Sequence, residues 1–466
     1  MIRPLLVTLL LSGFFSFGIS QTSIVIEHIE LCGNKRTRDE ILFRELTIRV
    51  GDTIPSEALQ DLITLNEYRL LNTGLFLRAS LQTAPLGDVP GHIGIDIVVK
   101  EVLYVVPIPI LEFADRNFNV WWVDQKRALD RINYGIDIVH SNLTGRRDVL
   151  GVLLQDGYTR KVELDYIIPF INQNQTIGLE GNVLYTRNQE VIYKTINNRQ
   201  QFFRSEDMFL FHRFRSRVGV VYRPGLWTSH RVTLTFRDYR TESYVQEFLN
   251  PDFFGDGRQR QRMVSLRYEW TLDERDILPY PIRGQFVQIG ATKDGVGLFR
   301  DRDVLFLDGH FARYRPWSDK WSTGTEVYAR WFVTRAKQAF YQNKALGYKD
   351  LYIRGYEYYV IDGMDFVLLK SAVRYELLNA HIRTFGPFGI EALKRIPIRI
   401  YLTANLDCGW VNEPYFSESN PLVNRWLTGG GIGIDCVVLY NKLVRLEFSA
   451  NDLGEKGVFL HYQFQF

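Results

Sequence analysis

Apolar and polar residues alternate along most of the chain after residue 103, which is the pattern of β-strands with two different faces. Eleven such strands are predicted between about 104 and 332, followed by an irregular stretch, 333–364, and then five more strands. The last five are predicted at about 365–378, 397–411, 427–438, 442–450 and 456–466. Sixteen is an even number, as a single-chain bacterial membrane barrel requires.

Segment 264–273 illustrates the two faces: Leu266 and Tyr268 share one side, while Arg267 and Glu269 share the other. In a soluble sandwich the polar face meets outside water, whereas in a membrane barrel the apolar face meets lipid and the polar face lines the lumen. Alternation alone fits both architectures, so other features of the chain must separate them.

The first twenty residues are typical of a secretory signal peptide. Arg3 is the positive residue, 5–17 is mostly apolar, and Gly18-Ile19-Ser20 places small residues where a signal peptidase reads them. We predict cleavage after Ser20. An uncleaved anchor is the alternative, but the apolar run is short and polar residues follow it at once.

The remaining chain contains no apolar run of about 18 residues, yet 14% of its residues are aromatic. Its last predicted strand places five apolar side chains on one face, namely Val458, Leu460, Tyr462, Phe464 and Phe466. A secreted, aromatic-rich chain of alternating strands favours a transmembrane antiparallel β-barrel, which we assign to residues 102–466.

Residues 21–101 combine helix signals with alternating strands, and this pattern predicts a small α+β domain. Thr37 and Glu40 form a possible capping box for a helix that ends near Leu46, and Ser56 is placed to cap a second helix that ends at Leu71. Strands are predicted before and after these helices, at 24–31, 75–83 and 93–100.

Composition and motifs argue against enzymatic, metal and nucleic-acid functions. The net charge is only +3, the three cysteines have neither metal nor disulfide spacing, and there is no G-x-S-x-G motif. Gly429-Gly-Gly-Ile-Gly433 lacks the G-x-G-x-x-G spacing and lies in a predicted strand, so we expect it to allow strand bending and close packing against side chains of the lumen. We therefore predict no enzyme, no cofactor, no bound metal and no nucleic-acid partner.

Several motifs resemble a known family. In the N-terminal domain, Gly33-Asn34-Lys35-Arg36-Thr37, Val50-Gly51-Asp52 and the segment Leu70–Phe76 resemble a POTRA domain. The barrel resembles the BamA/TamA superfamily of outer-membrane assembly and translocation proteins, also called the bacterial surface antigen family. The resemblance covers nearly all of the chain after Ser20.

Three barrel motifs carry this resemblance. Ile353-Arg354-Gly355-Tyr356 is similar to the family's (V/I)RG(F/Y) motif, which lies on an extracellular loop folded into the lumen. Asn405-Leu406-Asp407-Cys408-Gly409 is similar to (F/G)xDxG, although Asn405 departs from the usual first residue. The third motif resembles D-x-R-D…P…G and consists of Asp273, Arg275, Asp276, Pro281 and Gly284.

The strand patterns place Glu376 and Asp407 on the lumen side of adjacent strands. Two such carboxylates repel each other unless a cation lies between them, and Arg354 offers a planar fork of donors. The resemblance implies that this arginine pins the inward loop, 333–364; the alternative is that each charge contacts only lumen water. The predicted loop lock comprises Ile353, Arg354, Gly355, Tyr356, Glu376, Asp407 and Gly409.

Pro107 and Pro109 fall in the first predicted barrel strand, 104–111, or alternatively in the linker just before it. Proline removes a backbone donor and is tolerated at sheet edges. If the prolines lie in the strand, the seam where it meets the last strand, near Phe464 and Phe466, should be weakly paired.

The resemblance implies a bacterial outer-membrane protein with a periplasmic POTRA domain that assembles, inserts or translocates other proteins. An open seam would let an unfolded client strand pair with an exposed edge. The alternatives are secretion of a dedicated partner through the lumen and a gated passive pore. Expected partners are outer-membrane lipid, unfolded or secreted clients, and accessory periplasmic or lipoprotein subunits.

Overall fold

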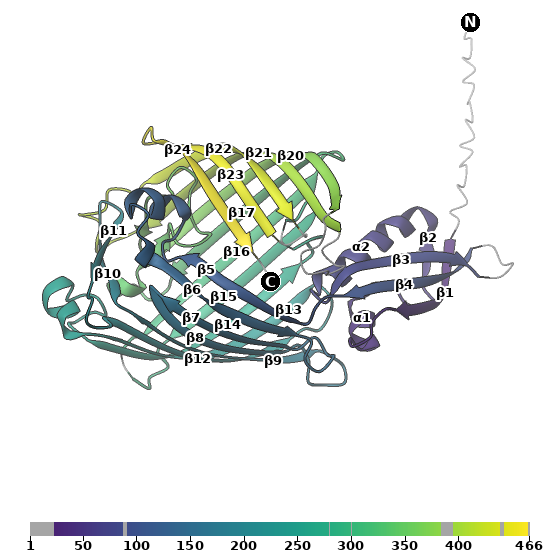
Figure 1. Cartoon of the computed structure of the whole chain (residues 1–466), viewed down its shortest axis with the longest axis horizontal. Coiled ribbons are helices and arrows are strands. Elements are labelled where there is room, and N and C mark those ends of the chain that lie inside the picture. Colours follow the sequence, from purple (N-terminus) through teal and green to yellow (C-terminus); the bar gives the residue numbers. More distant parts are fainter. Residues whose placement is uncertain are drawn as a thin grey trace, which may run out of the picture.

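The computed structural model describes residues 23–86, 91–278, 280–299, 301–383, 395–438 and 442–464. The predicted signal peptide and Phe466 lie outside these residues. The described chain forms a small N-terminal domain and a large curved sheet that closes around a lumen (Figure 1). Among the described residues, no helix is both long and apolar enough to cross a membrane.

The N-terminal domain packs two helices against a sheet whose strand order is β2-β1-β4-β3. β1 and β4 are parallel, and the other neighbours are antiparallel. Its elements are β1 (Ser23–Cys32), α1 (Asp39–Glu45), β2 (Thr53–Pro55), the 3-10 turn η1 (Ser56–Ala58), α2 (Leu59–Asn72), β3 (Phe76–Pro85) and β4 (His92–Glu101). This arrangement confirms the predicted α+β domain.

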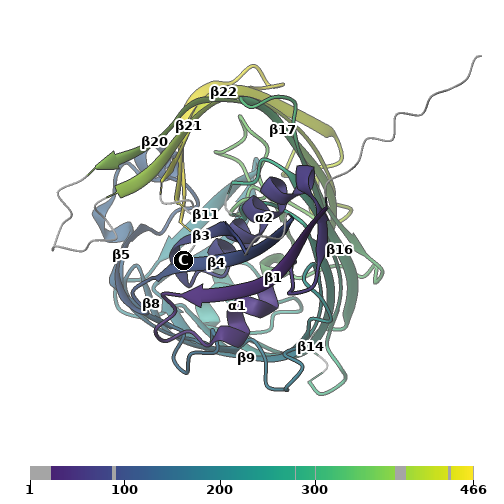
Figure 2. The same cartoon turned by 90° about the vertical axis from the view of Figure 1, so that its right-hand side faces the viewer.

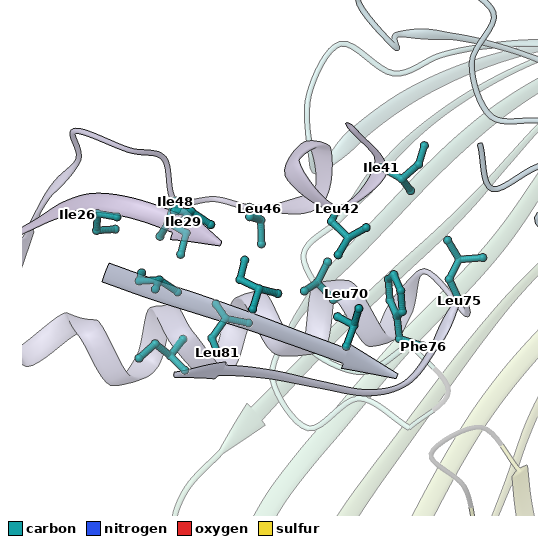
Figure 3. Close-up of a cluster of buried hydrophobic side chains, with 14 of the residues drawn as sticks. Ile26, Ile29, Ile41, Leu42, Leu46, Ile48, Leu70, Leu75, Phe76 and Leu81 are labelled. Atoms are coloured by element: carbon teal, nitrogen blue, oxygen red, sulfur yellow. The ribbon is translucent and has the colours of Figure 1, made fainter. Parts of the chain in front are cut away.

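The core of this domain forms where the apolar faces of its helices meet the sheet (Figure 3). Ile41 and Leu42 come from α1, Leu70 comes from α2, and all three are almost completely buried. They pack with Ile26 of β1 and Leu81 of β3. Burial of these apolar side chains is the main stabilising contribution within the domain.

The predicted capping box at Thr37 is wrong. α1 begins at Asp39 after Arg38, whose side chain makes no capping hydrogen bond. The Thr37 hydroxyl instead donates to Glu101 Oε1 at 2.7 Å, and the same oxygen accepts the Thr37 N–H at 2.8 Å. Thr37 therefore binds the carboxylate of Glu101, at the end of β4, and does not cap α1. The second helix follows the turn η1 and ends at Asn72, one residue beyond the prediction.

The sixteen predicted barrel strands are confirmed, and neighbours along the chain pair antiparallel from β5 to β24. The first eleven are β5 (Val105–Phe113), β6 (Ile132–Ser141), β7 (Val149–Gly157), β8 (Thr159–Ile168), β9 (Ile177–Asn188), β12 (Phe211–Tyr222), β13 (Thr228–Thr241), β14 (Arg260–Asp273), β15 (Gly284–Asp294), β16 (Val304–Pro316) and β17 (Trp321–Phe332). The last five are β20 (Asp365–Arg383), β21 (Arg395–Asn412), β22 (Trp426–Val438), β23 (Lys442–Asn451) and β24 (Lys456–Phe464).

Shorter elements lie in the loops between the barrel strands, and β10 and β11 lie at the end of the barrel away from the N-terminal domain (Figure 1). The shorter elements are two hairpins, β10 (Glu190–Ile196) with β11 (Arg199–Arg204) and β18 (Lys344–Leu346) with β19 (Ile361–Asp362), two π-helical turns, η2 (Val120–Asp124) and η4 (Val245–Leu249), and two 3-10 turns, η3 (Leu129–Arg131) and η5 (Phe340–Gln342).

The faces of the barrel wall are arranged as a membrane barrel requires. Leu266 is 45% exposed and Leu406 is 65% exposed, whereas Glu269, Asp407 and Glu447 are buried. Apolar side chains therefore point away from the barrel and charged ones point into it, the reverse of a soluble protein.

A buried carboxylate joins the N-terminal domain to the barrel, whose mouth the domain faces (Figure 2). Glu45 Oε2 accepts a hydrogen bond from Arg69 of α2 at 3.0 Å, and both its oxygens accept from Arg223 of the barrel at 2.6 and 3.0 Å. Arg147 Nη1 lies 3.4 Å from Oε1. Burial opposes ionisation of Glu45, but the Arg223 hydrogen bond and the surrounding guanidinium charges outweigh it and lower its pKa to about 2.

Two further contacts fix the same joint. Phe170, from the turn between β8 and β9, is 4% exposed and is buried in the core of the N-terminal domain. Asn72, at the end of α2, donates its Nδ2 to the Asp276 carbonyl at 2.6 Å and accepts the Leu278 N–H at 3.4 Å. The domain is therefore held on the barrel turns by three contacts: the ion pairs of Glu45, the buried side chain of Phe170 and the hydrogen bonds of Asn72.

Replacing Glu45 by alanine should loosen this joint. The change leaves the clustered arginines without their shared carboxylate, and loss of one partner of a buried ion pair costs about 3–5 kcal/mol. Chymotrypsin should then cut the detergent-solubilised full chain faster at Leu103 or Tyr104, between the two parts. Glu57→Ala, which removes an exposed acid of the same domain, is the control. Equal cleavage of the two variants would contradict the docking role of Glu45.

Candidate functional site

The connection between β17 and β20, residues 333–364, folds into the barrel, and we call it the inward loop. Ile353 and Tyr356 are each 1% exposed and pack in an apolar cluster with Leu368 of β20 and Val411 of β21. The loop therefore buries its own side chains against the inner face of the barrel wall.

Arg354 ties the inward loop to two strands of the wall. Its Nη1 donates to Asp407 Oδ1 of β21 at 2.5 Å, and its Nε donates to Glu447 Oε2 of β23 at 3.0 Å. The Arg354 backbone N–H also donates to Asp407 Oδ2 at 3.1 Å. Arg354 is 4% exposed and both carboxylates are buried. Each buried charge thus has a charged, hydrogen-bonded partner, without which it would be strongly unfavourable in this position.

Lys370 adds a second cation to the cluster. It lies opposite Asp407 in the β20–β21 register, and its Nζ is 3.5 Å from Asp407 Oδ2. The same ammonium donates to the carbonyl of Tyr352 in the inward loop at 2.7 Å. Asn405 Nδ2 donates to Glu447 Oε2 at 3.0 Å. The cluster therefore comprises two cations, two carboxylates and one amide.

Two glycines allow the loop to approach the wall this closely. A Cβ on Gly429 of β22 would lie 1.8 Å from the Arg354 carbonyl oxygen. Gly355 has φ +82°, and a Cβ there would lie 2.7 Å from the Ala450 backbone. Asn451 Nδ2 donates to the Gly355 carbonyl at 2.7 Å, and the Tyr356 hydroxyl donates to Asp452. Gly429, the first glycine of the run 429–433, therefore serves close packing against the inward loop.

Glu376, which the sequence analysis placed in this cluster, does not contact Arg354. It lies opposite Tyr401 on β21 and accepts a hydrogen bond from the Tyr401 hydroxyl at 3.0 Å. Six residues separate it from Lys370 along β20, a rise of about 20 Å, so it faces the lumen at a different height. The second carboxylate of the cluster is Glu447, which the alternation of 442–450 places on the polar face but does not connect to Arg354.

Gly409 takes part through packing alone. A Cβ there would lie 2.5 Å from Ile353 Cδ1, so the glycine leaves room for a side chain of the inward loop. With the contacts above, the structure brings together Ile353, Arg354, Gly355, Tyr356, Asp407 and Gly409 of the predicted loop lock, with Glu447 in place of Glu376.

The motif Asp273-Arg275-Asp276…Gly284 forms the turn between β14 and β15, beside the N-terminal domain. Arg275 makes a bidentate pair with Asp273 at 2.8 and 2.7 Å. Asp276 Oδ1 accepts the Ile282 N–H at 3.0 Å, and Gly284 has φ +108° with the Glu274 carbonyl only 2.1 Å from where a Cβ would be. Since the Asp276 carbonyl accepts from Asn72, this motif shapes the turn on which α2 rests.

Pro107 and Pro109 both lie inside β5, and Phe464 is the last residue of β24. β5 and β24 are the two ends of the sixteen-strand sheet, and within the described residues no ladder of backbone hydrogen bonds joins them. We call the line between these two strands the seam. The alternative placement of the prolines, in a linker before the strand, does not agree with the structure.

The end of the lumen away from the N-terminal domain is covered by interlocked loops. Asn198, in the tight turn of the β10–β11 hairpin, donates Nδ2 to Val360 of the inward loop at 3.2 Å. Its Oδ1 accepts the N–H of Leu422, in the loop between β21 and β22, at 2.9 Å. Asn198 is completely buried, so one side chain connects three loops.

Comparison with known proteins agrees with this geometry. Residues 24–102 match the family model of the POTRA domain, described as surface antigen variable number repeat. A search of curated proteins finds no match to the chain. The fold is similar to that of BamA from Haemophilus ducreyi lacking POTRA domains 1–3, with 14% identity, a TM-score of 0.51, and coverage of 94% of this chain and 84% of that chain.

The fold is also similar to that of CdiB from Escherichia coli, with 10% identity and a TM-score of 0.55 over 98% of this chain and 93% of that chain. The described chain is thus a POTRA domain followed by a β-barrel. The domain match identifies the POTRA domain, and the shared fold agrees with the barrel that the motifs indicated.

Replacing either Arg354 or Glu447 should release the inward loop from the barrel wall. Arg354→Ala leaves two buried carboxylates without their main cation, and Glu447→Gln removes one of the two negative charges; loss of a partner from a buried pair costs about 3–5 kcal/mol. Trypsin should cut faster at Lys349, inside the loop. Glu376→Gln is the matched control and should behave as the wild type. A released loop in Glu376→Gln, or none in Arg354→Ala, would refute this assignment.

Gly429→Ala should displace the inward loop without changing any charge. The added methyl group would meet the Arg354 carbonyl at 1.8 Å, and overpacking of this kind typically costs about 1–3 kcal/mol. The thermal midpoint of the purified barrel should fall, and trypsin cleavage at Lys349 should increase. Gly181→Ala, in β9, adds a methyl group where no atom lies within 4 Å and should change neither.

Proposed function

We propose that this protein inserts client proteins into the bacterial outer membrane through the seam between β5 and β24. The observation that carries the proposal is the missing β5–β24 ladder within the described residues, beside a lumen whose outer end is covered by loops. A client strand can satisfy its backbone groups on an exposed strand edge and leave sideways into lipid. A path straight out through the lumen is blocked by the inward loop.

In this proposal the barrel lies in the outer membrane, with its apolar outer face against lipid, and the POTRA domain lies in the periplasm. The POTRA sheet offers a second strand edge, because β3 is the last strand of the order β2-β1-β4-β3. An unfolded client can add a strand there before it reaches the seam. Accessory periplasmic or lipoprotein partners belong to the same proposal.

Secretion of a partner protein through the lumen is the second candidate. A cavity of about 470 Å³ lies in the lumen beside the inward loop, and its lining includes Arg275, Tyr280, Tyr352, Lys370, Arg374 and Arg445. The fold similarity to CdiB is in line with this candidate. Secretion would require the Arg354 cluster to break, so that the inward loop can leave the lumen.

Closing the seam with a covalent link should block client insertion. Asn119, in the loop after β5, contacts Val458 of β24, so cysteines at these two positions can be joined by a short bis-methanethiosulfonate, which reacts with both thiols and releases methanesulfinate. The experiment uses the full chain with its three native cysteines replaced by serine. Insertion of newly made outer-membrane barrels should stop in the linked protein and recover after reduction when the linker is cleavable.

A pair of cysteines at Asn119 and Val123, both in the loop after β5, is the control, because a link there leaves the seam open. Depletion of the protein, followed by comparison of the outer-membrane proteome, separates the two candidates. Loss of many barrels supports insertion, whereas loss of one secreted protein supports secretion. Unimpaired insertion in the protein linked at the seam would refute lateral opening.

A further inference from the structure

The lumen cavity of about 470 Å³ lies between the inward loop and the turn that joins β14 and β15. The inward loop contributes Tyr352 and Arg354 to its lining, and the turn contributes Tyr280. Tyr280 reaches across the lumen, because its ring stacks on that of Tyr401 of β21 and its hydroxyl donates to Asp435 of β22 at 2.9 Å. The volume falls in the range of about 300–1,000 Å³ that is common for small-molecule sites. The lumen therefore has room for a small ligand between these two segments.

The lining of this cavity is predominantly cationic. Five arginines and two lysines line it, against three carboxylates. Four of the seven cations have carboxylate partners in the barrel. Arg275 pairs with Asp273 and Arg445 pairs with Asp435, each at 2.7 Å, and the other two belong to the Arg354 cluster.

Arg374 of β20 is a buried cation of the lining that lacks such a partner. It is 7% exposed, and no carboxylate oxygen of the described residues lies within 4.0 Å of its guanidinium nitrogens. Its Nη1 donates to the Pro281 carbonyl at 2.7 Å, whereas its Nε is buried without a hydrogen-bond partner. The rings of Tyr280 and Tyr314 have their centroids 4.4 and 5.5 Å from its Cζ. A carbonyl and two ring faces offset only part of the cost of burying this charge.

The lining carboxylate on the neighbouring strand does not neutralise Arg374. Glu326 of β17 lies opposite Lys370, four residues from Arg374 along β20. Its two oxygens accept hydrogen bonds from the hydroxyls of Tyr314 and Tyr328, at 2.8 and 2.6 Å. Arg374 thus keeps a positive charge at the wall of the cavity, where an anion beside it would be favourable.

We propose that this cavity binds a small soluble phosphate compound, either inorganic phosphate or a phosphate monoester, with Arg374 as its principal ligand. A guanidinium presents parallel N–H donors that match two oxygens of a phosphate group. Arg354 and Lys370 line the same cavity and add positive charge that favours a dianion. A bound phosphate therefore links the β14–β15 turn to the inward loop and holds that loop more firmly in the lumen. The site does not depend on the route by which clients leave the barrel, so it goes beyond the proposed function.

The test uses the purified full chain in dodecyl maltoside and a phosphate-free buffer near neutral pH. Isothermal titration calorimetry measures the binding of inorganic phosphate and of glycerol 3-phosphate, and we expect saturable binding. Arg374→Gln should weaken this binding about tenfold or more, because charge-assisted hydrogen bonds to the phosphate are lost. Arg217→Gln is the matched control, since Arg217 of β12 pairs with Asp165 and lies outside the cavity lining, and it should keep the wild-type affinity.

Trypsin gives a second readout. Phosphate should slow cleavage at Lys349, which lines the same cavity, in the wild type and in Arg217→Gln but not in Arg374→Gln. Arg374→Lys keeps the charge without the fork of donors, so it should bind with intermediate affinity, and it replaces Arg374→Gln if that variant does not fold.

A tetraglutamate peptide distinguishes a phosphate site from one for acidic protein segments. Tighter binding of this peptide than of either phosphate compound would overturn the class of ligand. The absence of saturable phosphate binding in the wild type, or an unchanged affinity in Arg374→Gln, would overturn the site itself.

Discussion

The charge cluster around Arg354 is the interaction on which the inside of the barrel depends. Asp407 and Glu447 are buried on β21 and β23, two strands apart in the sheet, and a negative charge buried there is strongly unfavourable without a cation beside it. Arg354 reaches both because the inward loop passes directly over Gly429, where any side chain would push it away. The loop, the two carboxylates and the glycine therefore depend on one another, and the position of the loop inside the lumen follows from them.

At the end of the barrel that faces the POTRA domain, the arrangement of charges is reversed: one carboxylate is surrounded by several arginines. There a single buried carboxylate, Glu45, is shared among arginines from the POTRA domain and from the barrel turns. Its lowered pKa means that these ion pairs persist as the pH falls to about 4.5 and are lost only as it falls further toward 2. Both clusters join segments that are far apart in the sequence, one at each end of the lumen.

The seam differs from both ends, because backbone pairing is replaced there by one side chain. Asn119 supplies two hydrogen bonds to β24, while the prolines of β5 withhold donors from the other side. Few bonds therefore separate this resting barrel from one with a free strand edge. Arg116 and Asn117, just before Asn119, donate hydrogen bonds to the inward loop. One short segment therefore contacts both the inward loop and the seam.

Helix and turn signals were enough to predict the α+β domain. Alternation predicted the sixteen strands and the inward direction of Asp407, because a period of two residues specifies which side of a sheet each residue of a strand occupies. The same period says nothing about height along the barrel. For that reason the sequence predicted only that Glu376 and Glu447 both face the lumen. The strand register placed Glu447 beside Arg354 and Glu376 beside Tyr401. The local signal at Thr37 was misleading, and Glu45 and Asn119 had none, since the partners of all three lie on elements that only the folded chain brings near. The sequence by itself determined the strands and their faces, while the tertiary structure decided which charges and amides meet, because such pairs depend on strand register and on contacts between residues 25 to 93 positions apart in the chain.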